Sequence, residues 1–323
     1  MTGPRRVAAI DCGTNSLRLL IAEADGDRTR DVVRTMRIVR LGEDVDRTGR
    51  LSGAALARAD AALTEYRAMI DAADVASVRM VATSAVRDAA NREEFDAMVE
   101  WVLGRRADVL TGIEEAELSF SGACAGLVDA GAPCPARPSA RVVMADVGGG
   151  STELVRGDPG SARVECAVSL DVGSVRMTER HVRCDPPARR EIAAIEADVR
   201  TALNASGFEV AGDAAGADPG HRLVGVAGTV TTVAAVALGL DRYDSARIHG
   251  SVLTRNVIDR AVGELLGLDR SRRAARAVIH PGRVDVIAAG AVILRTLMAH
   301  LQAETLTVSE HDILDGIVLG LWA

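Results

Sequence analysis

The sequence predicts a mixed α/β protein built from two related domains, and three observations support this prediction. Strand-like and helix-like segments alternate along the chain, which is typical of α/β architectures. Residues 11–19 (DCGTNSLRL) align without gaps onto residues 146–154 (DVGGGSTEL), and each copy lies between two apolar runs. A segment rich in proline, 130–140, separates the two halves. A chain of 323 residues is also long enough for two domains.

The first half is predicted to contain a β-hairpin followed by further strands and helices. Apolar runs bounded by turn residues predict the strands. Ser52 is a candidate N-cap of a long helix, and Asn91 with Glu94 three residues later predicts a capping box. The expected strands are 7–10, 17–24, 32–41, 78–82 and 109–110, and the expected helices are 52–73, 91–102 and 114–128.

The second half repeats the strand–loop–strand pattern after the proline-rich segment. We therefore assign residues 1–128, together with a closing helix within 306–323, to the first domain, and residues 129–305 to the second. The expected elements of this half include strands at 142–145 and 222–224, a strongly apolar helix at 286–301 and the closing helix at 312–321.

The composition excludes several classes of protein. A net charge of −7 argues against a general nucleic-acid or membrane-surface binder, and an aromatic content of 2% leaves few platforms for base stacking. No apolar run approaches the roughly 20 residues of a membrane helix, and no secretory signal is visible. Five cysteines without a CxxC pair predict reduced thiols in a cytoplasmic protein. All 38 basic residues are arginine, so a Walker-type loop, which needs lysine, is excluded.

Each copy of the repeat is a candidate phosphate-binding turn. In each copy an aspartate, Asp11 or Asp146, ends the first strand, and its carboxylate can hold Mg²⁺ directly or through water. Small residues follow, and consecutive N–H groups in such a turn form an anion-binding nest. An ordinary glycine-containing hairpin explains either turn alone, but the matched spacing of the two favours phosphate binding. The candidate phosphate ligands in the two turns are Asn15, Ser16, Gly148, Gly149 and Ser151.

A third glycine-containing segment, 225–229 (GVAGT), follows a predicted strand and leads into a helix. Backbone N–H groups and the helix dipole make such a helix start a site for anions. Gly228 and Thr229 are therefore further candidate phosphate ligands. This pattern alone is weak evidence for phosphate binding, because a plain strand–helix turn has the same residues. Its place after the second hairpin strengthens the prediction.

Hydrolysis of a phosphoanhydride needs a positioned water and a group that accepts the water proton. Glu114 and Glu115 at a predicted helix start, and Glu153 in the second repeat, are the candidate carboxylates. Acids at a helix start also commonly complement the helix dipole, so that alternative stays open. Arg87 ends a strand-like segment and is a candidate phosphate ligand, with a surface arginine as the alternative.

Two groups of residues are expected to have no role in catalysis. The histidines lack metal-ligand spacing, and an arginine cluster is expected to form a solvated helix face. These residues are His249, His280 and His311, and Arg272, Arg273 and Arg276.

These segments together resemble the exopolyphosphatase / guanosine pentaphosphate phosphohydrolase family. The resemblance spans nearly the whole chain in order, and the set is specific although each piece alone is not. The segments are 11–16 (DCGTNS), 40–43 (RLGE), 82–87 (ATSAVR), 111–117 (TGIEEAE), 146–154 (DVGGGSTEL), 225–229 (GVAGT), 280–285 (HPGRVD) and 309–312 (SEHD).

The resemblance implies a duplicated ribonuclease-H-like fold, as in the sugar kinase, heat-shock chaperone and actin superfamily, with two domains flanking a cleft. It implies that Glu115 is the catalytic base for water, and that Asp146 and Glu153 bind Mg²⁺ and orient the water. The other residues that it implies in the site are Asp11, Asn15, Ser16, Arg87, Gly148 and Ser151.

The expected activity is that of an exopolyphosphatase acting on inorganic polyphosphate, with guanosine pentaphosphate as a second candidate substrate. The chain ends at Ala323 without the additional C-terminal helical region of long family members, which favours short polyphosphate. A homodimer is expected from the family. A small-molecule kinase of the same superfamily and a non-catalytic regulator that binds guanosine tetraphosphate or pentaphosphate remain as alternatives. The Glu114–Glu115 pair favours water activation over the first, and an intact Glu115 opposes the second.

Overall fold

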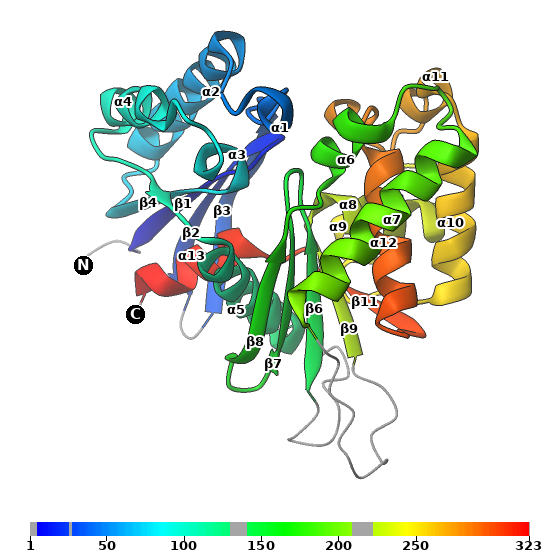
Figure 1. The fold of residues 1–323 in the computed structure, drawn as a ribbon. Coiled ribbons are helices and arrows are strands. Elements are labelled where there is room, and N and C mark those ends of the chain that lie inside the picture. The colour runs from blue at the N-terminus through cyan, green and yellow to red at the C-terminus, as the bar shows by residue number, and fades with distance from the viewer. Residues whose placement is uncertain (1–4, 26–27, 130–140, 209–221, 323) are drawn as a thin grey trace. The chain divides into compact units, whose positions relative to one another are not determined.

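The computed structural model describes residues 5–25, 28–129, 141–208 and 222–322 of the chain (Figure 1). Internal contacts divide the chain into two compact units. The first unit is Met1–Gly122 with Ile313–Ala323, and the second is Ala123–Asp312. The chain therefore passes from one unit to the other within the long helix α5 (Gly112–Asp129), and returns after Asp312. The proline-rich segment 130–140 lies outside the described residues.

The first unit contains a five-stranded sheet with the order β3-β2-β1-β4-β5. Its helices follow the predicted segments closely, with two additional short helices, α1 and α3. The strands are β1 (Arg6–Cys12), β2 (Ser16–Asp25), β3 (Arg28–Ile38), β4 (Ser77–Ala82) and β5 (Asp108–Val109). The helices, besides the first part of α5, are α1 (Val45–Thr48), α2 (Gly53–Ala72), α3 (Ser84–Arg87), α4 (Arg92–Leu103) and α13 (Ile313–Trp322).

Apolar packing covers both faces of this sheet. Ala8, Ile10 and Cys12 of β1 belong to a core shared with α2 and α4. Val7 and Ala9, which point to the opposite face because side chains alternate along a strand, belong to a second core with α13. The sheet is thus the middle layer of the first unit (Figure 1). The apolar side chains of its inner strand β1 are buried on both sides.

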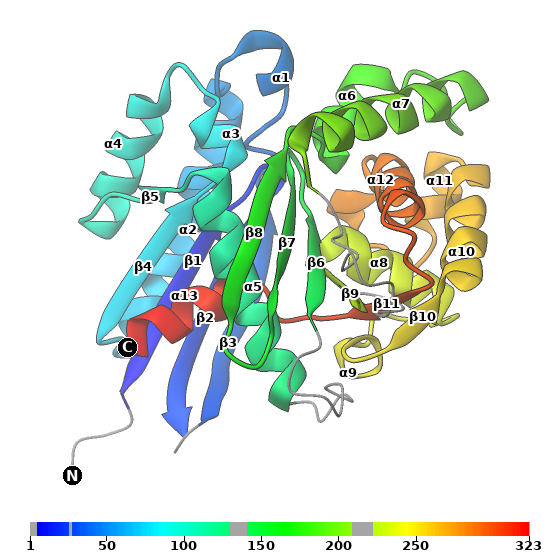
Figure 2. The ribbon, with the colours of Figure 1, turned by 60° about the horizontal axis from the view of Figure 1, so that its bottom comes forward.

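The second unit contains a six-stranded sheet with the order β10-β11-β9-β6-β7-β8. Figure 2 shows α7, α8, α10 and α12 on one face of this sheet. The strands are β6 (Val142–Val147), β7 (Thr152–Asp158), β8 (Arg163–Leu170), β9 (Arg222–Val226), β10 (Val252–Thr254) and β11 (Thr305–Val308). The helices are α6 (Ser174–His181), α7 (Arg189–Ser206), α8 (Ala227–Ala237), α9 (Ser245–Ile248), α10 (Arg255–Gly267), α11 (Arg270–Ala274), the 3₁₀ helix η1 (Pro281–Arg283) and α12 (Ile287–His300).

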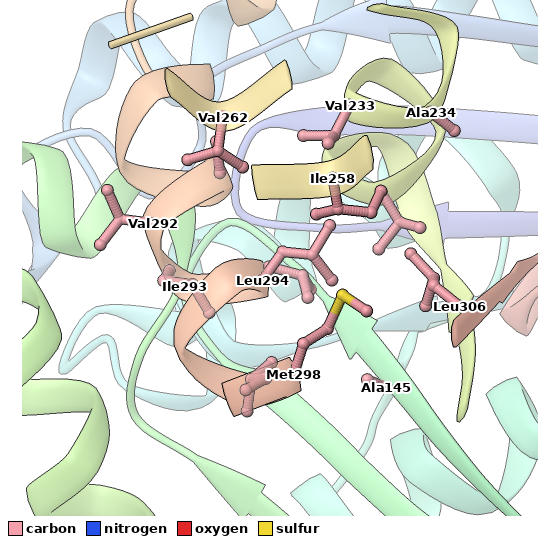
Figure 3. Close-up of a cluster of buried hydrophobic side chains, with 14 of the residues drawn as sticks. Ala145, Val233, Ala234, Ile258, Val262, Val292, Ile293, Leu294, Met298 and Leu306 are labelled. Carbon is pink, nitrogen blue, oxygen red and sulfur yellow. The ribbon is translucent and has the colours of Figure 1, made fainter. Parts of the chain in front are cut away.

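The core of the second unit lies between its sheet and these helices. Figure 3 shows Leu294 and Met298 of the apolar helix α12 among Val233 of α8, Ile258 of α10 and Leu306 of β11. All five side chains are almost completely buried, so α12 is the central helix of this layer.

The two sheets share one topology, which confirms the predicted duplication. In each unit the first two strands form a hairpin, and the third strand pairs antiparallel with the second. The fourth strand then pairs in parallel with the first, as β4 does with β1 and β9 with β6. One more parallel strand extends this side, β5 next to β4 in the first sheet and β11 next to β9 in the second. The strand β10 is an additional edge strand of the second sheet and pairs antiparallel with β11. This order, 3-2-1-4-5 with only the second strand reversed, is the ribonuclease-H-like arrangement.

Among the local predictions, the Ser52 cap is confirmed, whereas a capping box and the end of one strand are wrong. The Ser52 hydroxyl accepts a hydrogen bond from Ala55 N at 3.1 Å and caps α2 as predicted. Asn91 does not form the predicted capping box, because its side chain binds the backbone N–H and C=O of Leu51 at 2.8 and 3.0 Å. The strand predicted to reach residue 41 ends at Ile38, since the backbone turns at Arg40, where φ is 47°.

The prediction that the arginine cluster of α11 is solvated is wrong for one member. Arg273 is only 4% exposed, and its guanidinium donates to Asp185 Oδ1 at 2.8 Å and to Leu268 O at 2.7 Å. A buried arginine needs such partners, and distant sequence positions provide them. Separately, no helix in the described part of the chain has both the length and the apolar character needed to span a bilayer.

Substitution of two helical glycines by alanine should change the free energy of unfolding in opposite directions. A Cβ on Gly316 of α13 would lie 2.0 Å from Leu118 O, whereas a Cβ on Gly263 of α10 would meet nothing within 4 Å. We expect Gly316→Ala to lower the free energy of unfolding by about 3 kcal/mol through overpacking. Gly263→Ala should raise it by about 0.5–1 kcal/mol through helix propensity. Urea unfolding followed by circular dichroism measures both, and equal effects would contradict the close approach of α13 to α5.

Candidate active site

The two copies of the repeat form equivalent turns in the two units. Gly13 N donates to Ser16 O at 3.0 Å in the β1–β2 turn, and Gly148 N donates to Ser151 O at 3.1 Å in the β6–β7 turn. In each hairpin the aspartate lies directly across from the residue seven positions later. The two copies of the repeat therefore match in strand register as well as in residue type.

The residue across from the aspartate separates the two turns chemically. In the first unit it is Arg18, whose Nε and Nη2 atoms both donate to Asp11 Oδ2, at 2.9 and 2.7 Å. In the second unit it is Glu153, so Asp146 stands opposite another carboxylate. Directly opposed residues lie on the same face of a sheet within about 5.5 Å. The first turn therefore holds a neutralised acid, and the second holds two neighbouring acids.

The two acids of the second unit are buried. Asp146 is 7% exposed and Glu153 is 1% exposed. The Ser169 hydroxyl of β8 donates to Glu153 Oε1 at 2.8 Å and fixes the orientation of this carboxylate. Two like charges in a buried position are costly unless cations or hydrogen-bond donors compensate them.

The carbonyl groups of the β6–β7 turn are held by the start of α6. Gly148 O accepts from Ser174 N, Gly149 O accepts from Val175 N at 2.8 Å, and Gly150 O accepts from Arg176 Nε at 2.7 Å. The approach is close, because a Cβ on Gly173 would lie 2.4 Å from Gly149 O. Glycine is therefore required at position 173 for this contact.

This anchoring directs the N–H groups of the same turn away from α6. The C=O and N–H of a trans peptide point in opposite directions, so the three anchored carbonyls orient three successive N–H groups alike. These groups belong to Gly149, Gly150 and Ser151, and no hydrogen bond from them to the described residues is found. Successive unpaired N–H groups of this kind form an anion-binding nest. Gly149 and Ser151 remain predicted phosphate ligands, whereas the N–H of Gly148, also predicted, is already bonded to Ser151 O.

The first turn is anchored by a different segment. Thr14 O accepts from Gly42 N at 2.8 Å, and Asn15 O accepts from Arg40 N at 2.9 Å. A Cβ on Gly42 would lie 2.2 Å from Thr14 Cγ2, so glycine is required there. The Thr14 hydroxyl pairs with Ser84 at the start of α3 at 2.8 Å. Segment 40–43, which resembled the family pattern without an assigned role, thus shapes this turn through Arg40 and Gly42.

Arg87 and Glu115, both predicted site residues, meet in the first unit. Arg87 Nη1 donates to Leu110 O at 2.8 Å and to Glu115 Oε2 at 3.2 Å. The Glu115 side chain is 13% exposed and that of Arg87 is 25% exposed. Arg87 is therefore not a free surface arginine, and the two predicted site residues form an ion pair with each other.

The two glutamates at the start of α5 differ in their partners. Glu114 Oε2 accepts from Thr111 N and from the Thr111 hydroxyl, both at 2.8 Å, as in a capping box. These bonds lower the pKa of Glu114, the backbone bond most strongly. The structural alternative raised for the glutamate pair thus applies to Glu114, whereas Glu115 points to Arg87.

The third predicted phosphate segment starts α8, and an arginine lies against it. Ala227 has a φ of 66°, and Gly228 and Thr229 follow in the first turn of the helix. A Cβ on Gly228 would lie 1.6 Å from Arg283 Nη1, so the guanidinium packs directly on this glycine. Thr229 is only 3% exposed, and its side chain packs against Gly290 of α12, so its backbone N–H is the candidate donor.

Arg283, Glu310 and Tyr243 were not among the predicted site residues. The segments that contain the first two, 280–285 and 309–312, matched the family pattern but carried no chemical role. Tyr243 Oη donates to Glu310 Oε1 at 2.6 Å, and burial followed by the charge of Glu310 raises the pKa of Tyr243. Arg283 also acts on this pKa, in the opposite direction, so the three groups are neighbours.

The histidines and Cys12 support the structure. His249 and His311 form an edge-to-face ring contact at 4.9 Å, although they are far apart in the sequence. His249 Nδ1 accepts from Glu310 N at 3.2 Å. Cys12 is buried, and burial followed by the charge of Asp11 raises its pKa, so the thiol stays protonated. No role in catalysis was expected of the histidines.

Metal binding by the described residues would rest on two protein carboxylates. The described residues include no group of three or more His, Cys, Asp or Glu side chains arranged to hold a metal. Mg²⁺ commonly binds through one or two carboxylates while waters and substrate phosphates complete its octahedral coordination. Asp146 and Glu153 fit this donor set, whereas Asp11 already holds Arg18.

The chain is similar over nearly all of its length to proteins of one phosphatase family. A model described as "Ppx/GppA phosphatase family" matches residues 20–322. A Mycobacterium tuberculosis protein named Exopolyphosphatase 2 is 45% identical over 329 residues, which cover 98% of each chain. A crystal structure of an exopolyphosphatase-like protein aligns with a TM-score of 0.87 at 41% identity, over 98% of each chain. That of the Aquifex aeolicus family member gives 0.79 at 29% identity, over 98% of this chain and 97% of the other. The protein therefore belongs to the Ppx/GppA phosphatase family.

Proposed function

We propose that the protein is an exopolyphosphatase that releases terminal phosphate from inorganic polyphosphate, and that short chains are its preferred substrate. The observation that supports this most strongly is the β6–β7 turn, where the unpaired N–H groups of Gly149, Gly150 and Ser151 lie beside the Asp146–Glu153 pair. An anion nest next to two acids suits a substrate that arrives with a divalent cation. The M. tuberculosis relative named Exopolyphosphatase 2 supports the same substrate.

In the proposed reaction, water attacks the terminal phosphorus and the bridging P–O bond breaks. The shortened polyphosphate leaves with the electron pair, and the Glu115 carboxylate accepts the water proton. The turn N–H groups bind the phosphoryl oxygens, and Arg87 and Arg283 add guanidinium donors. Asp146 and Glu153 would hold Mg²⁺, which when bound would offset the negative charge on those oxygens. Asn15 and Ser16 would bind phosphate from the first turn.

The 5′-phosphate of guanosine pentaphosphate is a second proposed substrate, because its hydrolysis is the same attack of water on a terminal phosphoryl group. Kinase activity would need a bound acceptor in place of water, and a pure regulator would need no base. The position of Glu115 beside Arg87, rather than in the helix cap, favours hydrolysis over both.

We also propose that the protein is a cytoplasmic homodimer. The four cysteines in the described residues are free thiols, which suits a reducing compartment. Light scattering of the purified protein measures the mass in solution, and a monomer at micromolar concentration would remove the dimer from this proposal.

The two glutamates of α5 provide a matched test of the base. Glu115→Gln should lower phosphate release from short polyphosphate by about 100-fold or more, because the amide cannot accept the water proton. Glu114→Gln should stay within about threefold of the parent, since it alters only a cap. The rate of inorganic phosphate release in saturating Mg²⁺ is the measurement. A similar loss in both variants would assign the effect of Glu115 to folding.

The two equivalent aspartates provide a matched test of the metal site. Asp146→Asn and Glu153→Gln should raise the Mg²⁺ concentration for half-maximal activity about tenfold or more, because each removes a ligand. Asp11→Asn should not shift this concentration, whatever its effect on the rate, since Asp11 holds Arg18. If Asp11→Asn shifts the Mg²⁺ requirement as strongly as Asp146→Asn, Asp11 is a ligand after all.

A further inference from the structure

A charged cavity lies among three helices of the second unit. Its volume is about 320 Å³, and α7, α10 and α12 line it. This size lies at the lower end of the range of small-molecule sites, roughly 300–1,000 Å³. Three arginines and two acids line it, so its formal charge is positive by one. These residues are Arg200, Arg255, Arg295, Glu196 and Asp259.

Three of the five charged side chains form ion pairs with one another. Arg295 Nη2 lies 2.8 Å from Glu196 Oε1, and Arg200 Nη2 lies 3.4 Å from Glu196 Oε2. Glu196 thus fixes one guanidinium from α12 and another from α7. Each guanidinium has five N–H donors, so both retain donors after these bonds.

The other two charges are not joined. Within the described part of the chain, no hydrogen bond or ion pair is found for the side chains of Arg255 and Asp259. They are one turn apart on α10, a spacing at which opposite charges readily pair. The same order and spacing gives ion pairs elsewhere in this chain, in Arg67–Asp71 and Arg92–Asp96.

An arginine and an acid that line the same cavity without pairing suit a ligand that has two kinds of polar group. An oxyanion would accept hydrogen bonds from Arg255 and Arg295, and the Asp259 carboxylate would accept from a hydroxyl. The negative charge of a carboxylate in the wall also repels a simple anion, whereas a sugar adds neutral hydroxyl groups that can donate to it. We propose that this cavity binds a sugar phosphate group, either free or as part of a mononucleotide.

The cavity is separate from the phosphate segments described above. Along α12, Gly290 contacts Thr229 at the start of α8, whereas the cavity is lined by residues from Arg295 to Ala299. At about 1.5 Å of rise per residue, these positions lie roughly 8–14 Å further along the helix. The proposed ligand would therefore bind the same unit at a second place.

Isothermal titration calorimetry with the full chain tests this proposal, using ribose 5-phosphate, guanosine 5′-monophosphate and inorganic phosphate as probes. We expect at least one of the first two to bind, and inorganic phosphate to bind more weakly. Arg255→Ala should weaken binding about tenfold or more, and Asp259→Asn should weaken the sugar phosphates but not inorganic phosphate. Arg260→Ala, on the same helix outside the cavity, is the matched control and should bind as the parent does.

An Asp146→Asn variant separates this cavity from the proposed active site. Sugar phosphate binding should persist in that variant at the parent affinity. If ribose 5-phosphate binds more strongly than guanosine 5′-monophosphate, the ligand is a free sugar phosphate. If the nucleotide binds more strongly, the ligand is a mononucleotide. The proposal is overturned if neither probe binds, if Arg255→Ala behaves like Arg260→Ala, or if Asp146→Asn abolishes binding.

Discussion

The geometry of the β6–β7 turn depends on its carbonyl groups being held from one side. Three successive carbonyls are bound by the first residues of α6, and the absent side chain of Gly173 makes that contact possible. Because each peptide group is planar and trans, fixing the carbonyls also fixes the N–H groups on the opposite side. A turn held only by its own hairpin would have no such constraint. Phosphate binding here would therefore be prepared by packing before any ligand arrives.

The duplication explains how one topology came to hold two kinds of turn. Both hairpins keep the aspartate at the end of the first strand and the glycine–serine hydrogen bond that closes the turn. They differ across the ladder, where Arg18 faces Asp11 but Glu153 faces Asp146. One substitution at one register position thus separates a neutral turn from an acidic one. Two copies of one sequence motif can therefore differ in chemistry, because the residue across the strand pair sets the charge beside the aspartate.

Much of the fold could be predicted from local patterns, and the failures have a common cause. Apolar runs and the Ser52 cap placed strands and helices well because these signals act within a few residues. Asn91 carried a correct local signal, but Leu51 competed for its side chain. Arg273 looked solvated, although Asp185 binds it within the fold. In the site, the pairing of Arg87 with Glu115 and the packing of Arg283 on Gly228 likewise required contacts that no spacing encodes.

In a chain without lysine, arginine provides the permanently charged side chains that can bind anions beside the backbone N–H groups, and this changes how the site can be built. An ammonium group is a single point charge, whereas a guanidinium offers five donors in a plane. Arg87 can therefore hold Leu110 O and the Glu115 carboxylate through one nitrogen and still present its other N–H groups to a phosphate. The same side chain would position the base and bind the substrate. A lysine ammonium has three donors on a single atom, so the same contacts would use all of them and would have to converge on one point.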